Sequence, residues 1–337
     1  MAWQRRRLGS RGPEITPVGF GAWAIGGGDW AFGWGPQDDA DSIAAIHAAL
    51  DAGVSWIDTA AAYGLGHSEE VVARALEGVS DRPLVFTKCG MVWQDQEDRV
   101  PRPNLRPEHI RRECDDSLRR LRVEAIDLFQ FHWPDTRTGT PVEESWGVMA
   151  DLVAQGKVRF AGLSNFDVAL LERCEPILHV DSLQPPFNAI QRGAAAAEIP
   201  WCVENGTGVI AYSPMMSGLL TGRFSKERMR SLDEGDWRRG FPEFQEPALS
   251  RNLALQDALR PVAERHGVSV AAVAVAWTLA WPGVTGAIVG ARSPAQVEGW
   301  IDAPDVVLTD EDLDEIAAAI ESTGAGEGPS RPPGLPG

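Results

Sequence analysis

The sequence is poor in several features that would mark particular classes of protein. It has four cysteines in 337 residues, and no two of them form a C-x-x-C pair. This argues against a disulfide framework or a metal site and is typical of reduced thiols in the cytoplasm. No stretch approaches the roughly 18 consecutive apolar residues of a membrane span. The basic N-terminal residues are not followed by the apolar segment of a secretory signal.

Positive charge is also scarce. The formal net charge is −17, from 31 Lys and Arg against 48 Asp and Glu. We therefore expect no nucleic-acid partner, because such a partner usually requires a basic patch. An anionic cofactor remains compatible, since it needs only a local cationic pocket. We expect a cytoplasmic protein that acts on a small molecule, without membrane attachment, and the sequence leaves the oligomeric state open.

What the sequence does contain is an alternation of strand-like and helix-like segments. Short apolar runs, typical of parallel strands buried on both faces, occur at 18–23, 55–60, 84–88, 127–132, 159–165, 182–188, 209–214 and 286–291. Amphipathic helical patterns lie at 41–53, 107–123, 141–156 and 309–323. Gly53 is placed to end the first helix, and Pro107 to begin the second.

Eight strands alternating with helices predict an α/β fold, a single (β/α)8 TIM barrel over residues 1–321. A doubly wound Rossmann domain would instead need a G-x-G-x-x-G motif that opens a helix. The stretch GGGDWAFGWG at 26–35 is glycine-rich, but no helical pattern begins inside it, so we expect an active-site loop there. Residues 3–18 predict a β-hairpin, turned at 10–12, that caps the barrel floor.

Two segments depart from this alternation. Residues 223–250 form a polar insert interrupted by Gly and Pro, and an insert of that length is usually functional or disordered. Part of it, GRFSKERMRSL at 222–232, either folds over a cofactor pyrophosphate or remains a solvated loop. The tail at 322–337 is rich in Gly and Pro, and we expect it to be disordered.

Polar residues gather at the C-terminal ends of the predicted strands, where (β/α)8 barrels place their active sites. Asp58 ends the second strand and Tyr63 follows it, Lys88 ends the third strand, and His132 ends the fourth. Taken singly, these are a turn residue, a packing residue, a solvated charge and a core histidine. Their coincidence on three successive strand ends favours a catalytic site. The other tyrosine of the chain, Tyr212, lies on the same predicted rim.

This set of side chains suits general acid–base catalysis. A phenol has a pKa of about 10, and a nearby ammonium group lowers that value. A carboxylate holds the ammonium in place and limits its desolvation cost. The phenol can then protonate a carbonyl oxygen, and an imidazole can orient that oxygen.

With these residues, the sequence resembles the aldo-keto reductase superfamily over residues 5–320, and within it the bacterial branch of general and glycerol-type reductases. The stretches that carry the resemblance are IDTAAAYGLGHSEE, FTKCG, DLFQFHWPD and GLSNF. The resemblance implies that Asp58, Tyr63, Lys88 and His132 are the catalytic tetrad. It also implies that NADPH, with NADH as the other possibility, binds in an extended pose without a Rossmann domain.

The resemblance assigns further residues to the coenzyme. Ser164, Asn165 and Gln184 match positions that hydrogen-bond the nicotinamide carboxamide, and Tyr212 matches the aromatic residue on which the nicotinamide ring stacks. The remaining expected contacts are Gly21, Ala22, Trp23, Asp58, Ser213, Gly218, Leu220, Gly290, Arg292, Ser293 and Gln296.

The stretch IVGARSPAQVEGW at 288–300 predicts a helix start that can bind phosphate. Ser293 fits the N-cap, Pro294 the first helical position and Gln296 the third, as in a capping box. Arg292 is expected to bind a 2′-phosphate, which favours NADPH. Gly299 and Trp300 depart from the Glu and Asn that the family often has near the adenine. Trp300 either stacks on the adenine or packs in the core.

Indoles on the same rim predict an aromatic substrate pocket. Besides Trp30, the residues expected to line it are Trp23, Trp34, Trp93 and Trp133. Such a pocket suits aldehydes and ketones with hydrophobic parts.

We therefore predict an NAD(P)H-dependent reductase of aldehydes and ketones, with Tyr63 as the general acid. Two other functions stay open: a cofactor-sensing subunit that holds NADPH with little turnover, and a Schiff-base aldolase with Lys88 as the nucleophile. The aldolase leaves Tyr63, Asn165, Gln184 and Arg292 without a role.

Overall fold

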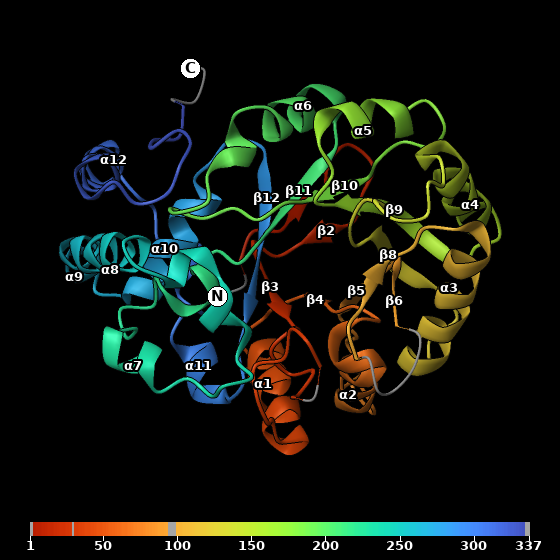
Figure 1. The fold of residues 1–337 in the computed structure, drawn as a ribbon, viewed down its shortest axis with the longest axis horizontal. Coiled ribbons are helices and arrows are strands. Elements are labelled where there is room, and N and C mark those ends of the chain that lie inside the picture. The colour runs from red at the N-terminus through yellow and green to blue at the C-terminus, as the bar shows by residue number, and fades with distance from the viewer. Residues whose placement is uncertain (1–2, 29, 94–98, 334–337) are drawn as a thin grey trace.

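A closed barrel of eight parallel strands forms the centre of the computed structural model, which describes residues 3–28, 30–93 and 99–333 (Figure 1). The order around the barrel is β10-β11-β12-β3-β4-β5-β8-β9. In chain order the strands are β3 (Val18–Gly21), β4 (Trp56–Asp58), β5 (Leu84–Cys89), β8 (Ile126–Phe131), β9 (Val158–Ser164), β10 (Ser182–Gln184), β11 (Gly208–Tyr212) and β12 (Val284–Gly290). Each overlaps one of the eight predicted strands, so the predicted (β/α)8 barrel is confirmed.

Helices surround the barrel, on the outside of the strands that they connect (Figure 1). The α-helices are α1 (Asp39–Asp51), α2 (His67–Ala75), α3 (Pro107–Leu121), α4 (Val142–Ala154), α5 (Val168–Cys174), α6 (Glu198–Asn205), α7 (Lys226–Arg230), α8 (Ala248–Ala258), α9 (Arg260–His266), α10 (Val270–Leu279), α11 (Pro294–Glu298) and α12 (Asp310–Thr323). Short 3-10 helices are η1 (Tyr63–Gly66), η2 (Gly193–Ala195), η3 (Met216–Gly218), η4 (Trp237–Gly240), η5 (Pro242–Phe244) and η6 (Ala303–Asp305).

The four predicted helices are present as α1, α3, α4 and α12, and local sequence explains their ends. The Asp38 side chain accepts hydrogen bonds from the first turn of α1, and Gly53 follows that helix with φ of 103°. Pro107 occupies the first turn of α3, where its missing N–H costs nothing. The sequence of helix α10 shows no amphipathic helical period, because nine of its ten residues are buried and the helix has no polar face.

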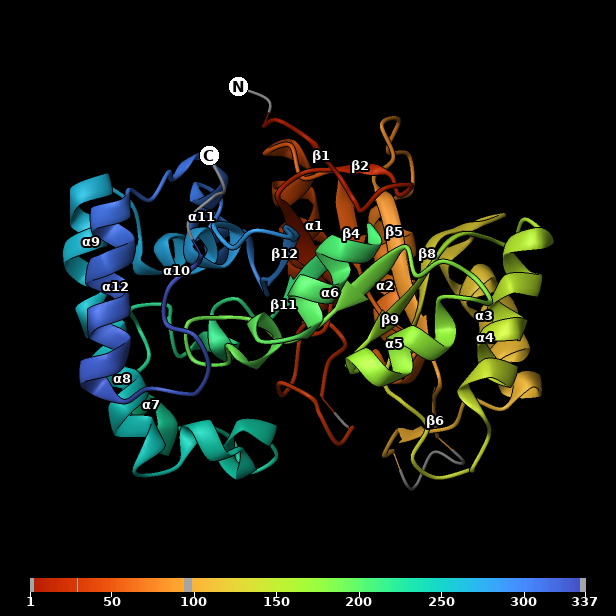
Figure 2. The same cartoon turned by 90° about the horizontal axis from the view of Figure 1, so that it is seen from above.

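A small hairpin closes one end of the barrel. Strands β1 (Arg6–Arg7) and β2 (Glu14–Ile15) pair antiparallel, at the end opposite α7 and the short strand β6 (Met91–Val92), which pairs with β7 (Arg102–Pro103) (Figure 2). Leu8 and Ile15 of this hairpin are fully buried against Trp56 and Phe86 inside the barrel. The predicted hairpin cap is confirmed.

Trp56 fills the part of the barrel interior next to the hairpin. Its indole is fully buried and donates a hydrogen bond of 2.9 Å to Thr16 O. A Cβ atom at Gly19 would lie 2.2 Å from this ring, so the neighbouring strand β3 can pass the indole only with glycine at that position. The barrel floor therefore depends on a matched pair of residues, one very large and one without a side chain.

The insert at 223–250 is more structured than the expected polar loop. It contains α7, η4 and η5 and leads into α8, and its apolar residues Phe224, Leu232, Phe244 and Leu249 are buried. These residues are irregularly spaced among charged ones, so neither a helical nor a strand period marks them in the sequence.

The disorder expected for the tail at 322–337 is wrong for its described part, which ends at residue 333. Ala325 is buried, and Arg192 donates hydrogen bonds to Ala325 O (3.1 Å) and Gly328 O (3.2 Å). At Gly326 a Cβ atom would lie 1.8 Å from Ile190 O, so the glycine allows a close approach to the loop after β10. Residues 334–337 lie outside the described residues.

All four cysteines are free and buried. Burial raises the pKa of Cys114, Cys174 and Cys202 to about 12, and that of Cys89 well above its usual range. Within the described ranges, no cluster of three or more His, Cys, Asp or Glu side chains has the arrangement of a metal site. None of the described helices has both the length and the apolar character needed to cross a bilayer.

Candidate active site

Four polar side chains meet at the C-terminal ends of β4, β5 and β8. Lys88 Nζ lies 2.5 Å from Asp58 Oδ1, 2.9 Å from Thr59 O and 3.2 Å from Tyr63 OH. The Lys88 and Asp58 side chains are buried, and the ring of His132 contacts that of Tyr63 edge-on at 5.5 Å between centroids. The structure thus brings together the four residues that the sequence singles out, from segments up to 74 positions apart in the chain (58 to 132).

An unusual turn directs Tyr63 toward Lys88. After β4 the chain passes through η1, where Gly64, Leu65 and Gly66 all have positive φ (61°, 57° and 101°). A Cβ atom at Gly64 would lie 2.0 Å from Gly26 O, in the glycine-rich loop after β3. Two stretches of backbone are therefore in direct contact here, which explains why both segments need glycine.

The charge states of the four residues follow from their burial. Burial and the Asp58 carboxylate raise the pKa of Tyr63 well above its usual range, so the phenol is protonated at neutral pH. The lowered value expected from the sequence is wrong for these side chains, because desolvation of the phenolate and its repulsion by the Asp58 carboxylate both raise the pKa. Burial lowers the pKa of Lys88, and Asp58 opposes that change. Burial and the charge of Lys88 hold the pKa of His132 well below its usual range, so its imidazole is neutral.

Neutral amides hold the second oxygen of Asp58. Gln184 Nε2 donates to Asp58 Oδ2 at 2.9 Å, and Gln130 Nε2 lies 3.5 Å from the same oxygen. Gln184 was expected to bind a nicotinamide carboxamide, and here its amide nitrogen binds the carboxylate instead. Gln130 was not singled out from the sequence. Its position two residues before His132, facing the barrel interior in an apolar strand, is a signal that could have identified it.

Asn165 and Tyr212 form a second polar group on the rim. The Tyr212 hydroxyl donates to Asn165 Oδ1 at 2.9 Å, and Asn165 Nδ2 donates to His132 O at 2.9 Å. Asn165 has φ of 64°, a conformation that asparagine tolerates better than most residues. Ser164 is buried, and its hydroxyl donates to Gln184 O at 2.9 Å. These residues connect the strand ends of β8, β9, β10 and β11 beside the four-residue set.

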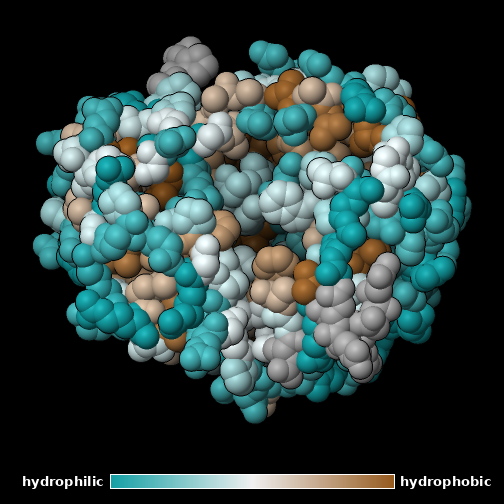
Figure 3. Space-filling model, in the orientation of Figure 1, coloured by the Kyte–Doolittle hydropathy of each residue, from teal (hydrophilic) through white to brown (hydrophobic). Residues whose placement is uncertain are grey.

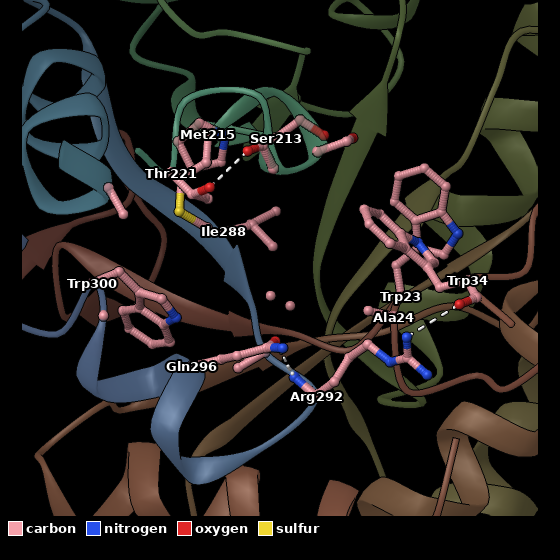
Figure 4. A pocket seen from close by; sticks show the side chains of 18 of the residues that line it. Trp23, Ala24, Trp34, Ser213, Met215, Thr221, Ile288, Arg292, Gln296 and Trp300 are labelled. Atoms are coloured by element: carbon pink, nitrogen blue, oxygen red, sulfur yellow. Dashed lines mark hydrogen bonds between the residues drawn. The ribbon is translucent and has the colours of Figure 1, made fainter. Parts of the chain in front are cut away.

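A cavity of about 400 Å³ opens onto this set, on the face of the molecule that is hollowed near its centre in Figure 3. Figure 4 shows this cavity, with Trp23 and Trp34 on one side and Trp300 on the other. Of the residues predicted from the sequence, those that line it are Gly21, Trp23, Trp34, Asp58, Tyr63, Tyr212, Ser213, Gly218, Gly290, Arg292 and Gln296.

Other predicted residues lie outside the cavity lining. Ala22 and Leu220 are fully buried in the core, and Ser293 is not among the lining residues. Trp93 is half-buried after β6 and does not line this cavity either. Trp133 is exposed and lines a separate cavity of about 790 Å³ together with Asn165. The structure therefore does not place Trp93 and Trp133 with the other two predicted pocket indoles.

Arg292 joins two loops at the edge of the cavity. Its guanidinium donates to Gln37 Oε1 at 2.6 Å, to Trp34 O at 3.1 Å and to Pro36 O. The predicted capping box is wrong, because the Ser293 side chain makes no cap hydrogen bond. Instead, Gln296 Oε1 accepts from the backbone N–H of Arg292 at 2.9 Å.

Two residues of the insert, not singled out in the sequence, close one wall of the site. The Trp237 ring stacks on that of Trp23, with centroids 5.1 Å apart, and Arg238 lies over the Trp34 ring at 4.5 Å. Arg238 is held by Asp236 at 2.6 Å in a buried ion pair. The aromatic and basic stretch DWRRGF at 236–241 was the available signal.

Positive charge is concentrated at this cavity despite the net charge of −17. The cationic side chains that line it are Arg223, Arg228, Arg238 and Arg292. Burial lowers the pKa of Arg292, and the neighbouring Arg238 adds to that effect. An anionic ligand would relieve the repulsion between these arginines.

Comparison with known proteins agrees with this geometry. The family model described as "Aldo/keto reductase family" matches residues 17–321. The chain is 35% identical to "Aldo-keto reductase YhdN" of Bacillus subtilis (strain 168) over 319 residues, which cover 94% of this chain and 93% of that protein. It is 31% identical to the "NADH-specific methylglyoxal reductase" of Escherichia coli (strain K12), over 93% of this chain and 98% of that one.

Solved structures give the same result. The glycerol dehydrogenase AKR11B4 from Gluconobacter oxydans superposes with a TM-score of 0.86 at 37% identity, over 97% of this chain and 98% of that chain. The aldo-keto reductase AKR11C1 from Bacillus halodurans has a TM-score of 0.77 at 23% identity, over 94% and 96%, and supports the fold. This chain belongs to the aldo/keto reductase family and is an NAD(P)H-dependent oxidoreductase.

Proposed function

We propose that this protein reduces aldehydes and ketones to alcohols with Tyr63 as the general acid. The observation that carries the proposal is the 3.2 Å contact between Lys88 Nζ and Tyr63 OH, in a buried set that opens onto a cationic cavity. NADPH is the coenzyme we propose, with NADH as the alternative. A relative whose name specifies NADH keeps that alternative open.

The cavity has the chemistry to hold a dinucleotide. Its wall carries arginines, which suit phosphate groups. A ligand with several phosphate groups would match these positive charges.

Particular residues would hold the two ends of the coenzyme. Tyr212 would support the nicotinamide ring, with Ser213 and Gly218 beside the pyrophosphate. Three of the five N–H donors of Arg292 are used within the protein, which leaves two for a 2′-phosphate. When bound, the coenzyme supplies the hydride that adds to the carbonyl carbon.

Side chains of the protein donate the proton that the carbonyl oxygen receives. Tyr63 is protonated at neutral pH and can donate its proton to the carbonyl oxygen. Lys88 donates a hydrogen bond to the phenol oxygen and so stabilises the phenolate that is left, while Asp58 keeps the buried ammonium charged. The neutral His132 carries one ring N–H that can orient the carbonyl oxygen.

The substrate class follows from the aromatic residues beside Tyr63. The rings of Trp23 and Trp30 lie 6.3 Å and 6.2 Å from that of Tyr63 between centroids. Together with Trp34, which contacts Trp23 edge-on at 5.4 Å, they make the approach to the phenol apolar. We infer a preference for carbonyl compounds with hydrophobic or aromatic parts.

The test is turnover of NADPH, followed by its absorbance, with 4-nitrobenzaldehyde, methylglyoxal and glyceraldehyde. In Tyr63→Phe we expect kcat to fall by about 10²–10⁴-fold. Tyr212→Phe removes the other phenol hydroxyl but keeps the ring, and kcat should fall much less in it than in Tyr63→Phe, because the Tyr212 hydroxyl bonds Asn165 and is not the proposed proton donor. Unchanged turnover in Tyr63→Phe would disprove the assigned acid. Coenzyme that co-purifies and is oxidised only once would indicate a cofactor-sensing subunit.

A further inference from the structure

Another buried ion pair lies behind the candidate active site, between the barrel wall and helices α2 and α3. Arg120 Nε donates to Glu69 Oε2 at 2.6 Å, and Glu69 is fully buried. The other carboxylate oxygen, Oε1, accepts from the Thr87 hydroxyl at 2.6 Å. Thr87 directly precedes Lys88 on β5, and alternation along the strand puts the two side chains on opposite faces. The ion pair is therefore attached to the outer face of the strand that carries the active-site amine.

Arg120 also supports the turn that carries Tyr63. A Cβ atom at Gly66 would lie 3.0 Å from Arg120 Cδ and 3.2 Å from its Nε, so the arginine rests directly on the backbone at the end of η1. Leu65, in the same turn, has a positive φ that is costly for a residue with a branched side chain. Such a conformation persists only when surrounding contacts enforce it. Gly26 enforces it on one side, and Arg120 on the other.

Stability alone does not account for this pair. Removing two charges from water is costly, and replacing a buried ion pair by apolar side chains is often neutral or stabilising. The pair instead connects the two segments whose separation matters most, the Tyr63 turn and the strand of Lys88. The Glu69 carboxylate contributes in a second way, since it adds to Asp58 in opposing the lowering of the Lys88 pKa by burial.

We propose that Arg120 and Glu69 are positioning residues, whose ion pair fixes the Tyr63 turn against β5 and so keeps the phenol oxygen within hydrogen-bond distance of Lys88. They act through Gly66 and Thr87 and do not line the cavity. The inference rests on the proposed function, because it concerns the geometry of the proposed acid.

The chain offers a matched control between the same two helices. Arg122 directly follows α3, and Glu77 lies two residues after the end of α2. They also form an ion pair, but their side chains are 62% and 60% exposed. The variants to compare are Arg120→Gln and Glu69→Gln against Arg122→Gln. The measurements are kcat, KM for coenzyme and carbonyl, the solvent deuterium isotope effect on kcat, and the thermal midpoint.

For Arg120→Gln and Glu69→Gln we expect kcat to fall by at least about tenfold, since small misplacements of reacting groups are costly. KM for the coenzyme should stay within about twofold, because the cavity walls do not change. The isotope effect should increase as proton transfer becomes slower. Arg120→Lys keeps a cation near Glu69 and should recover part of the loss. Arg122→Gln should behave as the wild type in every measurement.

A folded Arg120→Gln variant with wild-type kcat and isotope effect would overturn the inference. If the single variants do not fold, the double variant Glu69→Met with Arg120→Leu removes both charges together, and wild-type kcat in that variant would overturn it equally. Tyr63→Phe measured in parallel separates the two proposals. If Tyr63→Phe is inactive while the Arg120 variants keep full kcat, only the positioning role fails. If Tyr63→Phe keeps full activity, the proposed acid itself is wrong.

Discussion

Arg238 lies over the indole of Trp34, with its guanidinium carbon 4.5 Å from the ring centroid. This contact joins the insert after β11 to the glycine-rich loop after β3, which are about 200 residues apart in the chain. Cation–π contacts of this kind contribute about 0.5–2 kcal/mol, depending on how far they are desolvated. Arg238 is buried, so the contact both closes one side of the cavity and places a cation there.

Arg238→Ala should weaken the binding of both coenzymes by about tenfold or more. The substitution removes a cation from the cavity wall and leaves Asp236 as a buried carboxylate without its partner. Tryptophan fluorescence quenching measures the affinities. Arg230→Ala, on the exposed face of α7, is the control and should bind both coenzymes as the wild type does. Unchanged affinity in Arg238→Ala would show that the insert does not contribute to coenzyme binding.

Arg292→Ala should discriminate between the coenzymes. The affinity for NADPH should fall by about tenfold or more, because charge-assisted hydrogen bonds to a phosphate are lost, whereas that for NADH should change little. Dissociation constants for both coenzymes, measured by tryptophan fluorescence quenching, test whether Arg292 discriminates between them. Equal losses for the two would exclude contact with a 2′-phosphate and point instead to the role of Arg292 in joining the loops.

Glu113 makes folding stability depend on pH. Its side chain is buried on α3, where one oxygen accepts from Gly90 N at 2.8 Å and the other has no partner among the described residues. Burial raises its pKa from 4.5 to about 8. Between these values the folded chain keeps a proton that the unfolded chain has released. Rising pH across this window therefore lowers the free energy of unfolding.

Glu113→Gln removes this dependence. Its free energy of unfolding relative to the wild type should increase as pH rises from about 5 to about 9, by up to a few kcal/mol, since one pKa unit corresponds to about 1.4 kcal/mol. Urea unfolding at several pH values measures the difference. Glu108→Gln, exposed in the first turn of the same helix, should show no comparable trend. A pH-independent difference for Glu113→Gln would contradict the assignment.

Gly19→Ala should destabilise the barrel, because the added methyl group would lie 2.2 Å from the Trp56 ring. Overpacking of this kind costs about 1–3 kcal/mol or more. Gly147→Ala is the matched control: this glycine lies inside α4 with open space around its missing side chain, and alanine there should stabilise by about 0.5–1 kcal/mol. Urea unfolding of both variants tests the pair, and similar stabilities would contradict the close packing at Trp56.

The barrel and the four-residue set could be predicted because both have local signals in the sequence. Each barrel strand is a short apolar run, and a polar residue that ends or follows such a run must lie at the same edge of the barrel as the others. Asp58, Lys88 and His132 satisfy this condition, so their convergence follows from the fold class. The resemblance of the local motifs then identified the family.

What could not be predicted depends on contacts between distant segments. In the insert, the rings of Phe224 and Phe244 pack against each other with centroids 5.4 Å apart, and Trp237 stacks on Trp23. Neither pairing produces a helical or strand period in the sequence. The Gly- and Pro-rich composition of the tail is typical of disorder, although Gly326 is needed for close contact with Ile190. The pKa of Tyr63 was predicted in the wrong direction, since the extent of its burial depends on the whole rim.

The burial of the cysteines has a practical consequence. Each thiol belongs to a different element, Cys89 to β5, Cys114 to α3, Cys174 to α5 and Cys202 to α6. The thiolate is the reactive form, and burial both shields it and raises its pKa. Alkylating reagents can therefore modify each sulfur only while its own element is open. The natural chain thus contains four site-specific reporters of local opening, which mass spectrometry can follow without any engineered label.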